Sequence, residues 1–365
     1  MTMRQRITAV ASLVAAGALL AACGGSTPAS TTSQSAAPGT TAAKDLVRSA
    51  ADGKALDCQT QLTSEDTIGY KVPKAKEKFR VTLMEVSLAA YYYQGIKKGA
   101  EDAAREAGVD LEVLAGQGYA SPQQQLEQAQ AALQRGTDAI ILAPSDINGS
   151  APIVKLAQDQ GVPVVNVSTF VAAPGAYHVL QDDAALGAAA ADRVAEALGA
   201  EGGEGIIIAG PANADWSKAR TEAFQARVAE KHPQLKVAAA PTQLVDPVAG
   251  LKSFEDAVQA HPNIKWIFNV HVAILPPASI PSPYKGNVTY VATGYEPDAV
   301  PALKDGSLDS TFGIEPIATG KVGVGTAVNV LNGTEQPHSQ CLPVSLFTKD
   351  DVGSPAADAQ LIPAS

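Results

Sequence analysis

Polar and aromatic residues follow three predicted strands in the first half of the chain. The apolar run Val81–Val86 leads into Ser87–Tyr93, which holds a serine and three successive tyrosines. Gly116–Ser121 follows the alternating stretch Val109–Val113, and Pro144–Asn148 follows the apolar run Ala139–Ala143. Hydroxyl and amide groups bind small ligands through hydrogen bonds, and tyrosine rings add apolar faces. The alternative is that these segments are ordinary surface turns, where polar residues are common.

The stretches that carry these turns alternate between strand and helix patterns. Val81–Val86 and Ala139–Ala143 are apolar runs typical of buried parallel strands, and small or apolar residues recur at helical spacing between them. In open parallel sheets, ligands bind beyond the carboxyl ends of the strands. The alternation begins again at Gly205–Ala209 and ends with a helix over Ile317–Leu331. The sequence therefore predicts an α/β fold with two doubly wound parallel-sheet lobes and a cleft between them.

The sequence lacks the usual signatures of catalysis. It contains no P-loop, no His-Glu-x-x-His and no Gly-x-Ser-x-Gly motif, and its five histidines are scattered. Gly202–Gly205 precedes a strand pattern instead of opening a helix, which is the wrong context for a dinucleotide-binding loop. We therefore expect no enzyme activity, no cofactor and no metal site. The net charge of −10 argues against nucleic acid as a partner, since that partner requires a basic surface.

The start of the chain has the pattern of an export signal. Arg4 and Arg6 precede the apolar stretch Ile7–Ala22, as in a secretory signal segment. The ending Leu-Ala-Ala-Cys at Cys23 resembles the bacterial lipobox. This resemblance implies that residues 1–23 are a lipoprotein signal peptide and that a lipid on Cys23 anchors the protein outside the cell membrane. Ordinary cleavage and release is the alternative.

Residues 24–78 are expected to form a disordered tether and leader. Gly24–Thr41 consists almost entirely of small and polar residues, which cannot bury enough apolar surface to become ordered. Export would permit a disulfide between the two remaining cysteines, Cys58 and Cys341. Such a bridge would join the leader to the last part of the fold. Two buried thiols are the alternative.

Several segments, taken in order, resemble the type I periplasmic-type solute-binding proteins. They are Gln94–Gly108, Gln128–Leu142, Asp183–Gly187, Arg220–Phe224, Gly294–Asp298 and Gly320–Gly333. The resemblance covers about residues 79–352 and implies two lobes that are joined by three hinge crossings and close on a ligand. It assigns residues 79–181 plus 315–338 to the first lobe, 182–314 plus 339–352 to the second, and 353–365 to a tail.

Two branches of this family imply different ligands and partners. In sugar-binding members, residues that match Asp183, Arg220 and Glu296 hydrogen-bond the sugar, and an ABC permease receives it. Carboxylate acceptors and a guanidinium fork suit adjacent hydroxyl groups. The chain is also similar to the periplasmic partner of the trimethylamine N-oxide sensor kinase, in particular at its tyrosines. That branch implies aromatic rings around a methylated amine and a membrane histidine kinase as partner.

The expected ligand-binding residues combine both branches with polar and aromatic positions at strand ends. They are Ser87, Tyr92, Tyr93, Tyr119, Asp183, Trp216, Arg220, His271, Tyr295, Glu296 and Glu315. Some of these have a purely structural alternative. Tyr92 could pack beneath the first helix, Arg220 could be a surface charge, and Trp216 could be a loop residue.

Overall fold

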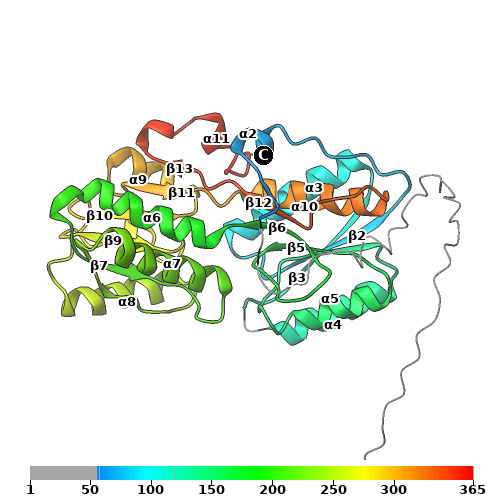
Figure 1. The fold of residues 1–365 in the computed structure, drawn as a ribbon, viewed down its shortest axis with the longest axis horizontal. Helices are drawn as coiled ribbons and strands as arrows, with labels where there is room; N and C mark the ends of the chain where they lie inside the picture. The colour runs from blue at the N-terminus through cyan, green and yellow to red at the C-terminus, as the bar shows by residue number, and fades with distance from the viewer. Residues whose placement is uncertain (1–55, 57, 120, 365) are drawn as a thin grey trace, which may run out of the picture. The chain divides into compact units, whose positions relative to one another are not determined.

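The computed structural model describes residue 56, residues 58–119 and residues 121–364 (Figure 1). Its strands form two sheets, and the chain passes between the sheets three times. Each sheet with its helices makes one lobe. The predicted α/β fold with two parallel-sheet lobes is confirmed.

The first lobe is built on a seven-stranded parallel sheet. In spatial order its strands are β1 (Thr60–Gln61), β12 (Ser339–Leu342), β6 (Tyr177–Gln181), β5 (Val164–Ser168), β4 (Ala139–Leu142), β2 (Arg80–Glu85) and β3 (Asp110–Ala115). Helices α3 (Tyr91–Ala107) and α10 (Pro316–Leu331) cover one face, and α4 (Pro122–Gln134) and α5 (Ala151–Asp159) cover the other. Every residue of β4 and β5 is buried, which explains the continuous apolar sequence of β4 and the mostly apolar sequence of β5.

Glycines allow α3 and α10 to pack in close contact. A Cβ atom on Gly99 would lie 2.0 Å from the carbonyl oxygen of Ile317, and one on Gly320 would lie 2.0 Å from that of Ile96. Only glycine tolerates this approach, because any larger side chain would clash with the facing backbone. These contacts join the second and third turns of α3, just after its three successive tyrosines, to the first two turns of α10.

The second lobe is built on a six-stranded sheet. In spatial order its strands are β13 (Leu346–Phe347), β11 (Ser310–Phe312), β10 (Thr289–Thr293), β9 (Trp266–Asn269), β7 (Gly203–Ile208) and β8 (Leu235–Ala239), and β13 alone pairs antiparallel. Its helices are α6 (Asp183–Leu198), α7 (Asp215–Lys231), α8 (Pro247–Ala260) and α9 (Ala299–Asp305). Phe224 of α7 stacks on Phe268 of β9 with ring centroids 4.7 Å apart, at the centre of this core.

The structure moves one predicted lobe boundary. The sequence placed residues 339–352 in the second lobe, but β12 pairs with β6 in the first sheet, with Ser339 opposite His178 and Leu342 opposite Gln181. All four residues of β12 are buried. The chain therefore leaves the first lobe only after Leu342, and only β13 from this segment joins the second sheet.

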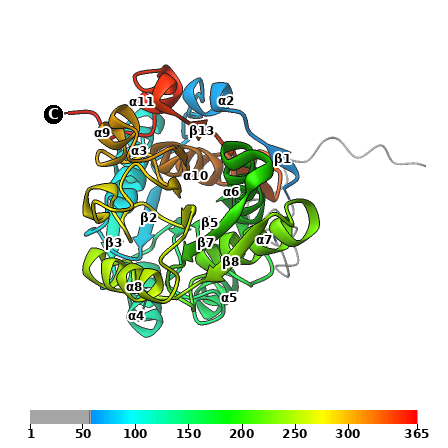
Figure 2. The ribbon, with the colours of Figure 1, turned by 90° about the vertical axis from the view of Figure 1, so that its left-hand side faces the viewer.

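Parts of the predicted leader and tail belong to the fold. Within the leader, Thr60–Gln61 is β1 and Ser64–Ile68 is helix α2, capped by the Thr63 hydroxyl. Within the tail, Pro355–Asp358 is helix α11. Figure 2 shows α2 and α11 next to each other, and the two helices are in contact. Residues 24–55 and 57 of the predicted tether and leader lie outside the described residues.

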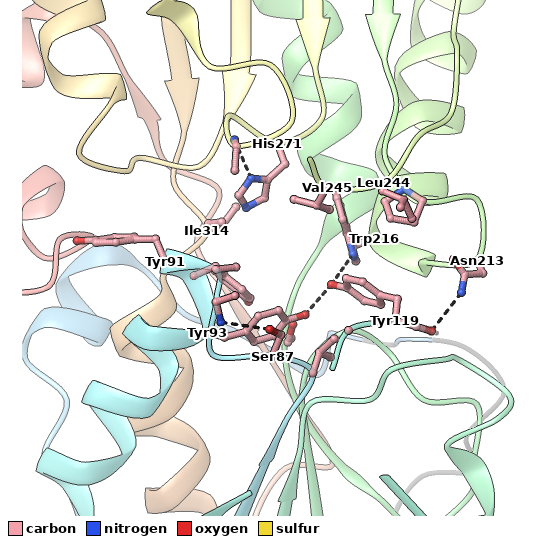
Figure 3. Close-up of a pocket in the computed structure, with 18 of the residues that line it drawn as sticks. Ser87, Tyr91, Tyr93, Tyr119, Asn213, Trp216, Leu244, Val245, His271 and Ile314 are labelled. Atoms are coloured by element: carbon pink, nitrogen blue, oxygen red, sulfur yellow. Dashed lines mark hydrogen bonds between the residues drawn. The ribbon is translucent and has the colours of Figure 1, made fainter. Parts of the chain in front are cut away.

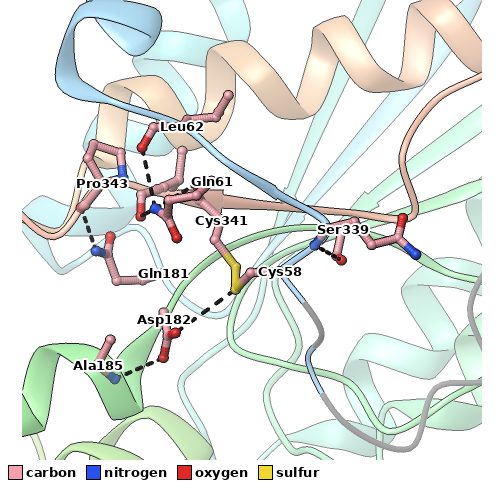
Figure 4. The surroundings of a disulfide bond; sticks show 11 residues. Cys58, Gln61, Leu62, Gln181, Asp182, Ala185, Ser339, Cys341 and Pro343 are labelled. Carbon is pink, nitrogen blue, oxygen red and sulfur yellow. Dashed lines mark hydrogen bonds between the residues drawn. A yellow bond between two sulfur atoms is a disulfide. The ribbon is translucent and has the colours of Figure 1, made fainter.

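Cys58 and Cys341 form a disulfide that fastens the leader to β12 (Figure 4). Their Cα atoms are 5.4 Å apart. Beside the bridge, the Leu62 amide donates to the Cys341 carbonyl at 2.8 Å, and the Gln61 side chain donates to the Leu342 carbonyl at 3.0 Å. The bridge and these bonds add β1 to the edge of the first sheet.

Within the described part of the chain, no helix combines the length and the apolar character that a bilayer crossing requires.

Candidate functional site

A cavity of about 600 Å³ lies between the two lobes, where turns that follow the strands of both sheets meet (Figure 3). The first lobe contributes residues that follow β2, begin α3, follow β3 and end β5. The second lobe contributes residues from the turn before α7, from α7 itself, from the loop before α8 and from the turn after β9. The cavity is thus located where ligands bind in open α/β sheets.

Tyrosines form most of the first-lobe wall. Tyr92 and Tyr93 meet edge to face with ring centroids 5.3 Å apart, and the hydroxyl groups of Tyr93 and Tyr119 are 2.5 Å apart. Burial raises the pKa of both Tyr93 and Tyr119, so these hydroxyls stay neutral and can donate hydrogen bonds. Ser168 completes the wall and has a left-handed backbone with φ 68°. Strain of this kind is found at ligand sites.

Arg220 is the fixed charge of the second-lobe wall. Its Nε donates to Asp183 Oδ1 at 2.8 Å, and its Nη2 lies 2.7 Å from the same oxygen. Its Nη1 donates to the Val270 carbonyl at 2.8 Å and to the Thr293 hydroxyl at 2.7 Å. These bonds use Nε and both N–H groups of Nη1, so Nη2 alone can offer a further N–H to a ligand. Trp216 lies beneath the guanidinium at 5.1 Å, within range of a cation–π contact.

Local geometry explains how Arg220 and Asp183 come together. Asp183 is the first residue of α6, and Arg220 lies in the second turn of α7. A Cβ on Gly187 would lie 2.2 Å from the Arg220 carbonyl oxygen, so this glycine lets the two helices touch. Burial raises the pKa of the Asp183 carboxyl, and the neighbouring guanidinium opposes that shift. Arg220 is buried, with 5 % of its surface exposed, so this pair is part of the protein interior as well as of the site.

His271 and Glu296 form a second polar pair beside Arg220. The Ala273 amide donates to His271 Nδ1 at 3.2 Å, which places the proton of a neutral ring on Nε2. That nitrogen is 3.7 Å from Glu296 Oε1, which is longer than a hydrogen bond. Burial, followed by the charge of Arg220, lowers the pKa of His271 to about 3. Burial, followed by Asp298, raises the pKa of Glu296 to about 7.

Among the described residues, Glu296 Oε1 is buried without a hydrogen-bond partner. Unpaired buried polar atoms are rare in folded proteins and call for an explanation. A ligand hydroxyl close to His271 Nε2 and Glu296 Oε1 could bond to both groups.

Aromatic contacts close the cavity between the lobes. Trp216 Nε1 of the second lobe donates to the Tyr119 hydroxyl of the first at 3.0 Å, and Asn213 Nδ2 donates to the Tyr119 carbonyl at 3.4 Å. The ring of His271 lies 6.5 Å from that of Tyr92 and 5.9 Å from that of Trp216. The two walls touch directly, so the structure represents a closed arrangement of the lobes.

Most of the residues selected from the sequence reach the cavity. Those that line it are Ser87, Tyr92, Tyr93, Tyr119, Trp216, Arg220 and His271. Asp183 and Glu296 are held next to this lining, through Arg220 and His271 respectively.

Tyr295 and Glu315 lie outside the cavity, contrary to the prediction. Gly294 has φ 95°, and after this turn Tyr295 enters the second-lobe core, with its ring 4.9 Å from that of Phe347. Glu315 begins α10 with a left-handed backbone, and its Oε1 accepts from Gln360 Nε2 at 2.6 Å. It therefore faces the C-terminal segment.

Other lining residues escaped the sequence analysis. They include Tyr91, Gln117, Ser168, Asn213, Leu244 and Val245. Tyr91 adjoins two selected tyrosines, so its position was a usable signal. Leu244 is 70 % exposed, and nothing in its sequence context marks it as part of a site.

The described residues contain no group of three or more side chains arranged to hold a metal ion. Cys23, the predicted lipidation site, lies outside the described residues.

The periplasmic binding protein domain family matches residues 83–335. This chain belongs to that family. It is therefore a solute-binding protein rather than an enzyme, and the family is extracytoplasmic.

Two relatives represent the two branches that the sequence resembles. The ribose import binding protein RbsB of Escherichia coli (strain K12) is 29% identical over 262 residues, covering 71% of this chain and 87% of that protein. Periplasmic protein TorT of Escherichia coli (strain K12) is 24% identical over 290 residues, covering 75% of this chain and 79% of that protein. The similarity to TorT is the weaker of the two.

A solved structure has the same fold. The carbohydrate transporter solute-binding protein from Agrobacterium radiobacter, in complex with D-arabinose, superposes with a TM-score of 0.73 at 21% identity. The match covers 78% of this chain and 99% of that protein.

Proposed function

We propose that this protein captures a small sugar in the interlobe cavity and delivers it to an ABC permease. The observation that carries the proposal is Arg220, which is buried at the cavity and held by Asp183. A guanidinium fixed in this way can donate to a sugar hydroxyl without losing further side-chain entropy. The relationship to a ribose import binding protein supports the same ligand class.

The rest of the cavity fits a sugar because it pairs hydrogen-bonding groups with flat apolar faces. His271 offers an N–H donor in the lining, the Glu296 carboxyl group lies next to it, and Asn213 of the lining offers an amide. The rings of Tyr92 and Trp216 present faces to the C–H surface of a sugar ring. A ligand that contacts both walls binds the closed form more tightly than the open form and so shifts the lobes toward closure.

We also propose that the protein acts outside the cell membrane, held there by a lipid on Cys23. The support is the lipobox-like ending of an export segment and the small, polar tether that follows it. The full-length chain should appear in the membrane fraction, and Cys23→Ser should release it. Equal release of both forms would contradict the anchor.

A panel of ligands tests the sugar proposal through the melting temperature. Pentoses, hexoses, polyols and trimethylamine N-oxide are each added to the purified chain without its signal segment. A ligand at about 100 times its dissociation constant adds about 2.7 kcal/mol of stability, which should raise melting by a few degrees. We expect the shift with a sugar and not with the amine oxide.

Two arginines of one helix supply a matched control. Arg220→Lys keeps the charge but loses the planar fork, so we expect it to abolish the sugar-induced shift. Arg227→Lys changes an arginine of the same helix that pairs with Asp192 away from the cavity, and we expect the shift to remain. The proposal fails if no sugar raises the melting temperature of the unsubstituted chain.

One observation favours a second candidate, the sensing of a methylated amine for a membrane histidine kinase. At the cavity, the centroid of the His271 ring lies 6.5 Å from that of Tyr92 and 5.9 Å from that of Trp216. Aromatic rings of this kind attract methylated, positively polarised nitrogen, and the chain has similarity to TorT. A melting shift with trimethylamine N-oxide alone, lost in Tyr92→Leu, would favour this candidate over sugar delivery.

A further inference from the structure

Both ends of the described chain pack against the hinge, and both lie outside the part that matches the family. The three crossings between the lobes are residues 182, 313–315 and 343–345. The leader reaches the third crossing, where the hydroxyl groups of Ser64 and Ser345 are 2.9 Å apart. The C-terminal segment, residues 353–364, reaches the second crossing. Helices α2 and α11 are in contact (Figure 2).

Gln360 makes two hydrogen bonds to one residue of the second crossing. Its Nε2 donates to Glu315 Oε1 at 2.6 Å, and its Oε1 accepts from the Glu315 amide at 2.9 Å. Gln360 is completely buried, with 0 % of its surface exposed. A Cβ on Gly313 would lie 3.0 Å from Gln360 Oε1, so the glutamine fits closely against this crossing.

These two bonds hold Glu315 in an unusual backbone conformation. Its φ is 47° and its ψ is 49°, a left-handed conformation that costs a non-glycine residue free energy. Such strain persists only where the surroundings fix it, and Gln360 binds both the backbone and the side chain of this residue. Burial raises the pKa of Glu315 to about 7, which agrees with a carboxyl group that faces an amide instead of a cation.

The same segment also contacts the wall of the cavity. The Ile362 amide donates to the Tyr91 hydroxyl at 2.6 Å, and Tyr91 lines the cavity from the first lobe. Helix α11 is anchored in the second lobe, because Ala357 is fully buried in the core of that lobe and Leu361 packs against the same core. The segment therefore connects the second lobe to a first-lobe residue of the site.

We infer that Gln360 is a positioning residue for the cleft. It holds the second crossing in place, and together with the Ile362 bond of the same C-terminal segment it stabilises the closed arrangement of the lobes. The inference depends on the two-lobe closure seen in the structure and not on the identity of the solute. Loss of the Gln360 bonds should therefore favour opening of the lobes even without ligand.

The two tryptophans of the chain allow opening to be measured directly. Trp216 lies at the cavity and bonds across the cleft to Tyr119, so opening would expose it to water. Trp266 has 0 % of its surface exposed in the second-lobe core and stays hidden whether the cleft is open or closed. Acrylamide quenching of intrinsic fluorescence, with no ligand present, therefore reports on Trp216.

We expect Gln360→Ala to increase quenching of Trp216. A net loss of about 1 kcal/mol corresponds to about a fivefold rise in the ratio of open to closed protein. The matched control is Asp358→Ala, which changes an exposed residue of the same segment. Its tryptophan fluorescence should be quenched to the same extent as that of the unsubstituted chain. Quenching of Gln360→Ala equal to that of the control would overturn the inference, even if Gln360→Ala melts at a lower temperature.

A residue exchange keeps the test decisive if the alanine variant folds poorly. Gln360→Glu places two carboxyl groups together and should open the cleft. Adding Glu315→Gln restores one amide and one carboxyl group, with the backbone amide of residue 315 still able to donate, and should return quenching to the original level. Failure of the double variant to restore quenching while both variants stay folded would contradict the inference. Since no ligand is used, this result is independent of the sugar assignment.

Discussion

The two walls of the cavity differ in their chemistry. The first-lobe wall consists of hydroxyl, amide and aromatic groups that carry no charge, led by Tyr92, Tyr93 and Tyr119. The second-lobe wall holds the charged arginine and the two titratable groups beside it, His271 and Glu296. One wall therefore supplies apolar faces and neutral hydroxyls, and the other supplies directional charged bonds.

This difference separates two tasks of a binding protein. Fixed charges with buried partners select hydrogen-bonding groups of the ligand, because an unpaired buried polar group is costly. Aromatic faces accept many apolar shapes and add contact area when the lobes close. We infer that the second lobe chooses the ligand and that the first lobe stabilises the closed complex.

Removing the fixed charge should have the largest effect. Arg220→Ala leaves the Asp183 carboxyl buried without its partner, which costs about 3–5 kcal/mol of unfolding free energy. The surface counterpart Arg227→Ala breaks an exposed pair with Asp192 and should cost about 1 kcal/mol or less. Urea-induced unfolding measures both values. Equal destabilisation by the two substitutions would contradict the larger contribution expected of the buried pair.

The second-largest effect is expected from the titration of Glu296, which makes the stability of the protein depend on pH. Its pKa is about 7 in the folded protein, above the usual 4.5, so the native state holds this proton more tightly than the unfolded chain does. Stability from this group is complete below pH 4.5 and is lost as the pH rises to 7, by roughly 2–3 kcal/mol.

Glu296→Gln isolates that change from other groups. His271 acts in the opposite direction, because its pKa of about 3 lies below the usual 6.5 and its contribution is lost as the pH falls. The stability difference between the unsubstituted chain and Glu296→Gln, measured from pH 4 to pH 8, should therefore shift in favour of the variant as the pH rises. A difference that stays constant with pH would contradict the raised pKa.

The smallest effect is expected on the uncharged wall. Tyr119→Phe removes the hydroxyl that bonds to Tyr93 and accepts from Trp216, at a cost of about 1 kcal/mol. It should also increase quenching of Trp216, because the bond across the cleft is lost. Tyr284→Phe, in the second lobe and outside the cavity, is the control. An effect as large as that of Arg220→Ala would remove the distinction between the walls.

The sequence by itself determined the alternation of strands and helices. Runs such as Ala139–Leu142 and stops such as Gly108 act locally, since a buried parallel strand must be apolar on both faces and a helix ends readily at a left-handed glycine. The strand-end turns then pointed to Tyr92 and Tyr119 as members of one site, and the resemblance to sugar-binding relatives added Arg220. Local pattern suffices here because the carboxyl ends of parallel strands meet at one edge.

Only the tertiary structure decided which neighbouring residues face the cavity. Tyr295 and Glu296 are adjacent in sequence, yet one packs in the core and the other beside His271, because the turn at Gly294 sends their side chains apart. Gln360 has no local signal at all, since its partner Glu315 is 45 residues away. The pairing of β12 with β6 is likewise set by a long-range ladder. Contacts of this kind depend on how distant segments meet in space, and the spacing of residues along the chain does not encode them.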